Sequence, residues 1–202
     1  MIRARGEPRP ASPYGVSKLA AEALVGAYAE TGAVDAVSLR YFSVYGPRQR
    51  PDMAAHRFIE ALLDHQPLTV FGDGTQMRDF TYVDDVVEAT VNALFADLPP
   101  GAVLDVASGR PTSVAELIGY LQALVGVPAD VRHSLERLGD VPRTEGALDA
   151  TVKHLRWSAK TDLRTGLDRQ LSWHRDIARR RQAADLRAHA HERSMSRTAG
   201  VQ

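Results

Sequence analysis

The chain has 202 residues, with 25 basic and 25 acidic side chains and no cysteine. This length suffices for one domain with a buried core, and the balanced charge gives no reason to expect nucleic acid or an anionic membrane as a partner. Without cysteine there is neither a disulfide framework nor a thiolate metal site, and no apolar run approaches the length of a membrane span. The polar first ten residues lack the apolar core of a signal peptide, so we expect a cytoplasmic protein.

Helical and strand-like patterns alternate along the chain. Residues 1–13, rich in proline and arginine, are expected to be loop. The patterns then predict helix 17–31, strand 36–45, helix 54–64, strand 68–71, an extended segment 79–83, a helix to about 95 capped by Asp84 or Asp85, strand 103–107, a helix to about 125, a short strand near 131, and helices at 149–155 and from 162 onward. Ser113 with Glu116 predicts a capping box before the helix that ends near 125. Such alternation indicates an α/β architecture.

The carboxyl-terminal segment 176–202 differs in composition from the rest. It is rich in arginine, alanine and histidine and has few apolar residues, so we expect a basic helix extension that becomes a disordered tail. His189 and His191 lie there without partner ligands, and no metal site is expected.

Tyr14 and Lys18 form a Tyr-x-x-x-Lys pair. Residues four apart lie on one face of a helix, so an ammonium group can lie beside a phenol. A free phenol has a pKa of about 10, and a nearby positive charge favours the phenolate. A tyrosine activated in this way can remove a proton from a sugar hydroxyl. An ordinary solvent-facing helix shows the same spacing, so this interpretation depends on the neighbouring motifs.

Two longer motifs follow the Tyr-Gly-x-Ser-Lys run in order: RYFSVYGPR at 40–48 and FGDGTQMRDFTYVDD at 71–85. Together the three motifs closely resemble the nucleotide-sugar epimerase/dehydratase family of extended short-chain dehydrogenases, over residues 8–174. The run RQRPDMA at 48–54 is most similar to the branch of UDP-glucose and UDP-glucuronate 4-epimerases. The resemblance implies a partial Rossmann-like, doubly wound α/β domain at 14–175, the carboxyl-terminal part of such an enzyme, with a small α/β substrate-binding region.

The resemblance also implies a reaction. Tyr14 would remove the proton from the C4 hydroxyl of a nucleotide-diphosphate sugar while hydride passes to bound NAD, which gives a 4-keto sugar. An epimerase rotates this sugar and returns the hydride to the other face. Lys18 would assist Tyr14 and hold the nicotinamide ribose, and Tyr41 would lie near the nicotinamide.

Substrate binding, of a UDP- or dTDP-linked sugar, is implied for five residues: Ser43, Phe71, Arg78, Arg137 and Asp140. Ser43 stands where many relatives carry an asparagine that faces the sugar nucleotide. Phe71 would stack on the base, and Arg78 would grip the diphosphate with its fork of donors. Arg137 would meet the phosphates, and Asp140 the nucleoside ribose.

The residues alone leave structural roles open as alternatives to substrate binding. Ser43 can be a small buried residue and Phe71 a core residue. Arg78 can form a surface ion pair with Asp73 or Asp79, which is worth little energetically.

One departure concerns the cofactor half. The family begins with a strand, a glycine-rich turn and a helix that holds the NAD pyrophosphate, and none of these precedes Tyr14. The catalytic Ser/Thr and the acid pair of the dehydratases, which lie upstream of the tyrosine, are missing too. We therefore expect a truncated product, poorly stable alone or completed by another polypeptide.

The activity of this chain alone is accordingly left open. The alternatives are a nucleotide-sugar 4,6-dehydratase or decarboxylase of the same family, or a non-catalytic remnant that binds a nucleotide sugar. The resemblance also suggests a homodimer that uses helix 17–31.

Overall fold

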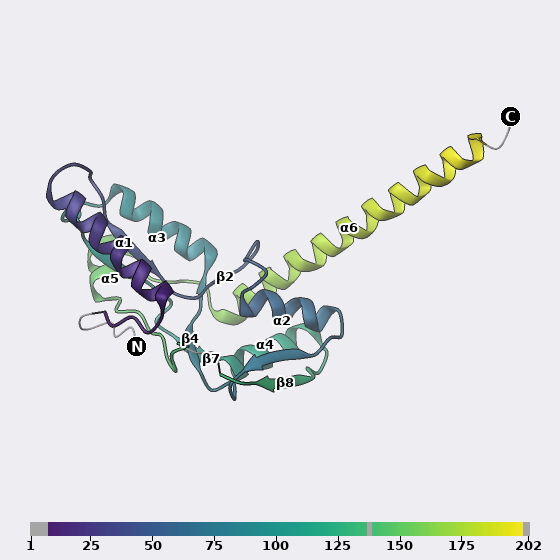
Figure 1. Cartoon of the computed structure of the whole chain (residues 1–202), viewed down its shortest axis with the longest axis horizontal. Helices are drawn as coiled ribbons and strands as arrows, with labels where there is room; N and C mark the ends of the chain where they lie inside the picture. Colours follow the sequence, from purple (N-terminus) through teal and green to yellow (C-terminus); the bar gives the residue numbers. More distant parts are fainter. Residues whose placement is uncertain (1–7, 137–138, 200–202) are drawn as a thin grey trace.

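The computed structural model describes residues 8–136 and 139–199 of the chain (Figure 1). Within these ranges, helices and strands alternate in the following order: α1 (Pro13–Glu30), β1 (Ser38–Tyr41), β2 (Val44–Tyr45), α2 (Ala54–Leu63), β3 (Leu68–Phe71), β4 (Met77–Asp79), β5 (Thr81–Tyr82), α3 (Val83–Phe95), β6 (Val103–Val106), β7 (Pro111–Ser113), α4 (Val114–Val125), β8 (Val131–Ser134), α5 (Asp149–Leu155) and α6 (Leu163–Ala199).

The described strands associate in pairs. β1 pairs in parallel with β6, β2 with β5, and β3 with β8, whereas β4 and β7 are antiparallel. Each parallel pair is connected through at least one helix, as a crossover between parallel strands requires. This confirms the α/β architecture expected from the sequence.

Two clusters of buried side chains hold the elements together. The larger one joins α2, β3, α4 and α6 through residues such as Ile59, Leu117 and Leu171, each without exposed surface. The smaller one joins α3 and β6 around Trp157 and Val106. In Figure 1, α1, α3 and α5 lie at one end of the body and α2, α4 and β8 at the other, while α6 extends away from both.

The helix starts test the capping predictions. The Ser113–Glu116 capping box is confirmed, with reciprocal side-chain bonds at the start of α4. α1 begins at Pro13, earlier than expected, because Ser12 caps it by accepting a hydrogen bond from the Gly15 amide at 3.2 Å.

The cap predicted at Asp84 or Asp85 is wrong. α3 begins at Val83, with Tyr82 at the N-cap and no side-chain cap. Asp85 is buried and accepts a hydrogen bond from the Thr161 amide at 3.0 Å. A tertiary partner far along the chain therefore uses the carboxylate that local sequence assigned to the helix end.

The helix extension expected in the carboxyl-terminal segment is present, and it runs to the last described residue. α6 continues to Ala199, and its side chains from Ala178 to Ala184 are all exposed. The division into domains at 13 and 175 stays a prediction. Among the described residues, no helix combines the length and the apolar character that crossing a membrane requires.

Candidate functional site

Tyr14 and Lys18 lie on the first turns of α1, facing solvent. The Tyr14 side chain is 72% exposed. The Lys18 Nζ atom lies 5.5 Å from the centre of the Tyr14 ring, over its face. Helical spacing therefore brings the two groups together, and the phenol and the ammonium are both accessible to a ligand. Their roles in catalysis and in NAD binding stay predictions.

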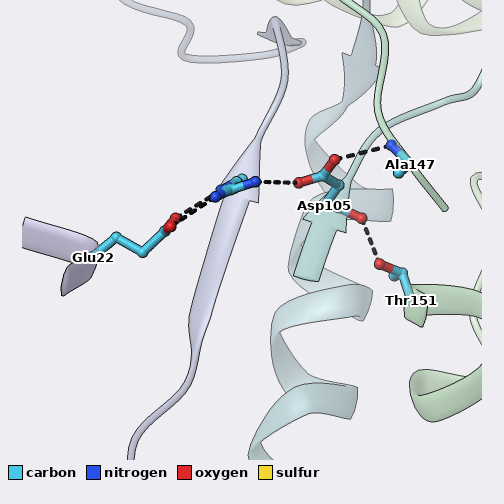
Figure 2. A network of polar contacts seen from close by, with 5 residues as sticks. Glu22, Asp105, Ala147 and Thr151 are labelled. Carbon is cyan, nitrogen blue, oxygen red and sulfur yellow. Dashed lines mark hydrogen bonds and ion pairs between the residues drawn. The ribbon is translucent and has the colours of Figure 1, made fainter. Parts of the chain in front are cut away.

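A chain of polar contacts fixes α1 to the sheet strands beneath it (Figure 2). Glu22 of α1 accepts two hydrogen bonds, each of 2.7 Å, from Arg40 of β1. The Arg40 Nη1 atom lies 3.7 Å from the Asp105 carboxylate of β6. Asp105 accepts a hydrogen bond from the Ala147 amide at 2.9 Å, and its backbone carbonyl accepts one from the Thr151 hydroxyl at 2.6 Å. The helix that carries Tyr14 is thus tied through β1 and β6 to α5.

Burial governs the electrostatics of this network. The hydrogen bond to Glu22 raises the pKa of Arg40, so the guanidinium stays charged. Burial raises the pKa of Asp105, although the Ala147 amide and Arg40 act in the opposite direction. Arg40 is therefore a permanent cation shared between two carboxylates, which suits it to an anchoring role.

Tyr41, expected near the nicotinamide, lies at the end of β1 with its hydroxyl directed at α3. The Thr90 hydroxyl lies 2.9 Å from the Tyr41 hydroxyl and donates its own hydrogen to the Val86 carbonyl at 2.7 Å. Tyr41 must then be the donor to Thr90. Its predicted contact with the cofactor remains untested.

Four of the five predicted substrate-binding residues line one pocket of about 310 Å³: Ser43, Phe71, Arg78 and Asp140. Phe71 ends β3, Arg78 lies in β4, and Ser43 and Asp140 come from connecting segments. The fifth, Arg137, lies outside the described residues. Tyr14, Lys18 and Tyr41 are not among the lining residues. Motifs far apart in the sequence thus meet at one site, and Gly139, next to Asp140, lies against the residues before α1, since a Cβ there would be 3.1 Å from the Ala11 carbonyl oxygen.

Arg78 is held in the pocket by neighbours that the sequence did not suggest. Its side chain is 15% exposed and forms an ion pair with Asp140. It also donates to the Met77 carbonyl at 2.7 Å. The Val141 amide donates to the same Asp140 oxygen at 3.1 Å.

The two carboxylates considered as surface partners of Arg78 are engaged elsewhere. Asp73 accepts bonds from the amide and hydroxyl of Thr75. Asp79 is fully buried and accepts bonds from Ser108 and from the Gly109 amide. The described structure therefore gives Arg78 a single acidic partner, Asp140, inside the pocket.

Sequence reasoning missed Arg57 and Gln49, which also line the pocket. Arg57 gives the pocket a second cation beside Arg78. Arg57 lies three residues after Ala54 in helix 54–64, so the two residues share one face of the helix. The sequence alone does not say which face of that helix meets β3, so this spacing could not identify Arg57 as a pocket residue.

Gln49 is held by the start of α2 and by α6. Its side-chain oxygen accepts hydrogen bonds from the His56 amide and from the Gln170 side chain, both at 3.0 Å. Gln170, fully buried, in turn accepts from the Gly46 amide at 3.0 Å. Gly46 has φ +134°, and a Cβ there would lie 2.7 Å from Val83. The Gly46–Gln49 turn is therefore locked in place beside the pocket by α6.

Residues 3–107, just over half of the chain, match the NAD dependent epimerase/dehydratase family. A relative from Bacillus subtilis (strain 168), described as an uncharacterized UDP-glucose epimerase, YtcB, is 36% identical over 164 residues, which cover 81% of this chain and 52% of the relative. The UDP-glucuronate 4-epimerase of Thermodesulfobacterium geofontis (strain OPF15) is 36% identical over 169 residues, covering 83% and 51%.

Solved structures of related enzymes are also similar to this chain. UDP-glucuronic acid 4-epimerase from Bacillus cereus, in complex with UDP-glucuronic acid and NAD, matches with a TM-score of 0.83 and 37% identity, over 87% of this chain and 56% of that one. MoeE5 in complex with UDP-glucose and NAD matches with a TM-score of 0.83 and 41% identity, over 86% and 59%. This chain spans about half the length of the curated relatives it matches. It belongs to the NAD-dependent epimerase/dehydratase family.

Proposed function

We propose that this chain serves the NAD-dependent 4-epimerisation of a sugar linked to a nucleoside diphosphate, UDP- or dTDP-. The pocket formed by Ser43, Phe71, Arg78 and Asp140 carries the proposal, because it gathers the residues expected to bind such a substrate. Relatives described as UDP-glucose or UDP-glucuronate 4-epimerases support the sugar class.

The pocket supplies complementary groups for each part of the substrate. Arg78, with Arg57 nearby, offers planar donors that suit a diphosphate. Phe71 offers an aromatic face to the base, and Asp140 offers carboxylate oxygens to the ribose hydroxyls. The Ser43 hydroxyl would bond the sugar. On binding, the diphosphate would replace Asp140 as the main partner of Arg78.

Proton transfer is assigned to Tyr14. Its phenolate would take the C4 hydroxyl proton, and the Lys18 ammonium beside the ring would stabilise that charge. Bound NAD would supply the hydride chemistry at C4. The exposed Tyr14 hydroxyl and Lys18 ammonium fit the polar nicotinamide ribose, and the described residues engage neither in an ion pair.

The test is turnover of the purified chain with NAD and UDP-glucose or UDP-glucuronate, followed by NMR detection of the 4-epimer. Tyr14→Phe should lower the rate about 10²-fold or more, because a general base contributes that much. Tyr120→Phe is the control, since Tyr120 is an exposed tyrosine of α4 outside the proposed site and the proposed dimer surface, and it should keep the wild-type rate. Equal rates for Tyr14→Phe and wild type would remove Tyr14 from the mechanism.

Binding of a nucleotide sugar without turnover is the second candidate. It is favoured by one observation: Tyr14 is not among the residues that line the pocket holding Arg78 and Asp140. Calorimetric binding of UDP-glucuronate, with no 4-epimer formed at saturating NAD, would select this function over the first.

We also propose a homodimer that uses α1. Leu24 and Tyr28, one turn apart on this helix, are 59% and 54% exposed, so they present adjacent apolar side chains to solvent, as the exposed patches of protein–protein interfaces do. Light scattering should give twice the mass of one chain, and Leu24→Lys should return the monomer.

A further inference from the structure

A cluster of two histidines and a carboxylate joins α2 to α6, apart from the residues assigned to substrate. His56 and Glu60 lie four residues apart on α2, and His174 comes from α6. The His56 Nε2 atom lies 3.1 Å and the His174 Nδ1 atom 3.9 Å from the same Glu60 oxygen. The two imidazole rings meet edge to face, with centroids 4.4 Å apart.

Hydrogen bonding leaves much of this cluster unused. The side chains of His56 and His174 are only 8% and 4% exposed. Their other nitrogens, His56 Nδ1 and His174 Nε2, are buried and have no hydrogen-bond partner among the described residues. A buried polar atom without a partner costs about 1–3 kcal/mol. These two atoms are not the ones that approach Glu60; the nitrogens turned toward its carboxylate, His56 Nε2 and His174 Nδ1, are the pair that an added ion could share with it.

We propose that His56, Glu60 and His174 form a binding site for a divalent transition metal, of which Zn²⁺ is the best match. One ligand atom from each residue lies within 4.8 Å of the other two. Zn²⁺ binds nitrogen and oxygen at about 2.0–2.2 Å, so two tetrahedral ligands lie about 3.3–3.5 Å apart. The 3.1 and 3.9 Å separations from Glu60 bracket this value, and all three ligand atoms lie within 4.8 Å of one another, so the two rings would have to close around the ion.

The ligand chemistry also agrees with such an ion. Two imidazoles and one carboxylate suit zinc and its neighbours, whereas Mg²⁺ and Ca²⁺ prefer oxygen alone. Glu60 is 47% exposed, which leaves an entry path and a fourth position for water.

The position of the site indicates a structural role. The ion would bridge α2 and α6 next to Ala55 and Arg57, both of which line the substrate pocket. It would therefore fix α6 against the helix that forms one pocket wall. The substrate assignments are independent of this site, because none of its three ligands lines the pocket.

Titration calorimetry of the metal-free chain with Zn²⁺ tests the proposal. The wild type should bind one ion tighter than about 1 mM and gain thermal stability on binding. His174→Gln and Glu60→Gln should each weaken binding at least tenfold, since even partners of ligands contribute 10–100-fold. Circular dichroism checks that each variant is folded, and Glu60→Gln changes only a half-exposed side chain.

The controls separate this site from adventitious histidine binding. His154→Gln removes an exposed histidine of α5, and His189→Gln/His191→Gln removes the distal pair; both should bind Zn²⁺ as the wild type does. Co²⁺ should give the visible absorption of a tetrahedral complex and quench Trp173, whose ring lies 4.9 Å from that of His174. Undiminished affinity in both His174→Gln and Glu60→Gln, or no wild-type binding below 1 mM, would overturn the proposal.

Discussion

Arg78 must exchange partners if it binds a diphosphate. In the described structure its guanidinium is paired with Asp140 inside the pocket. A diphosphate carries more charge than one carboxylate and can accept both donors of the fork. The ion pair with Asp140 therefore keeps the guanidinium oriented. The gain in binding free energy from Arg78 is the difference between its interaction with the diphosphate and its interaction with Asp140.

Replacing Arg78 tests this exchange. Arg78→Ala should weaken UDP-sugar binding about 10- to 100-fold, because charge-assisted hydrogen bonds contribute about 1.5–3 kcal/mol. Arg132→Ala is the control, since Arg132 is exposed and pairs with the nearby, exposed Asp130. Calorimetry on both variants measures the effect. A dissociation constant unchanged by Arg78→Ala would place the diphosphate elsewhere.

At the residue scale, sequence reasoning named candidate residues but not all of the neighbours that the fold gives them, and the binding roles of these residues stay predictions. Resemblance placed Ser43, Phe71, Arg78 and Asp140 on the list of substrate residues, and the fold brings all four to one pocket. Neither the resemblance nor the helical pattern predicted that Arg57 lines the pocket, because a helical pattern does not say which neighbour a given face of the helix contacts. Helical spacing predicted that Tyr14 and Lys18 would meet, since that contact is local.

α1 depends on Glu22 for its attachment to the sheet strands. Glu22→Gln keeps the side-chain shape but removes the charge paired with Arg40, whose side chain is 30% exposed. We expect about 1–2 kcal/mol less stability and faster amide exchange in α1. Glu30→Gln, an exposed glutamate on the same helix, should leave both unchanged. Equal exchange in the two variants would show that apolar packing alone holds α1.

The α4 capping box makes stability depend on pH. The Ser113 amide and hydroxyl each donate to Glu116 at 2.8 Å and hold the pKa of this carboxyl below its ordinary value of 4.5. Because the folded-state pKa is the lower one, the carboxylate stabilises the fold above pH 4.5, and that stabilisation is lost as the pH falls through the folded-state value.

Glu116→Gln should therefore lose less stability on acidification than the wild type does. Urea unfolding at a series of pH values from neutral to acid measures the two slopes. Glu30→Gln should follow the wild-type slope. Parallel curves for Glu116→Gln and wild type would show that the box adds no pH dependence.

The elements also show where local sequence signals fail. Ser113 and Glu116 are adjacent to the helix end they cap, and the prediction from their spacing was correct. Asp85 was misassigned because its partner, the Thr161 amide, is 76 residues away. The predicted strand 36–45 is divided into β1 and β2, which pair with β6 and β5 respectively. Periodicity within one strand cannot reveal a change of partner.

Over the whole molecule, α6 has two parts with different physical roles. Its first turns insert Leu167, Gln170 and Leu171 into the body, each without exposed surface. From Ala178 to Ala184 every side chain is exposed, and in Figure 1 this part extends away from the other elements. Composition predicted a helix extension that becomes a disordered tail; the helix of the described residues runs to Ala199, and the boundary at 175 stays a prediction.

Two truncations separate these roles. A chain that ends at Ala184 should keep its unfolding free energy within about 0.5 kcal/mol, because it retains every described buried residue of α6 and its last seven residues are already exposed. A chain that ends at Gly166 should not unfold cooperatively, because it loses two core leucines at about 2–5 kcal/mol each and leaves the Gly46 amide without Gln170. Urea titration followed by circular dichroism measures both. A large loss of stability in the longer chain would mean that the distal half of α6 packs against a surface, most simply in a second copy of the chain.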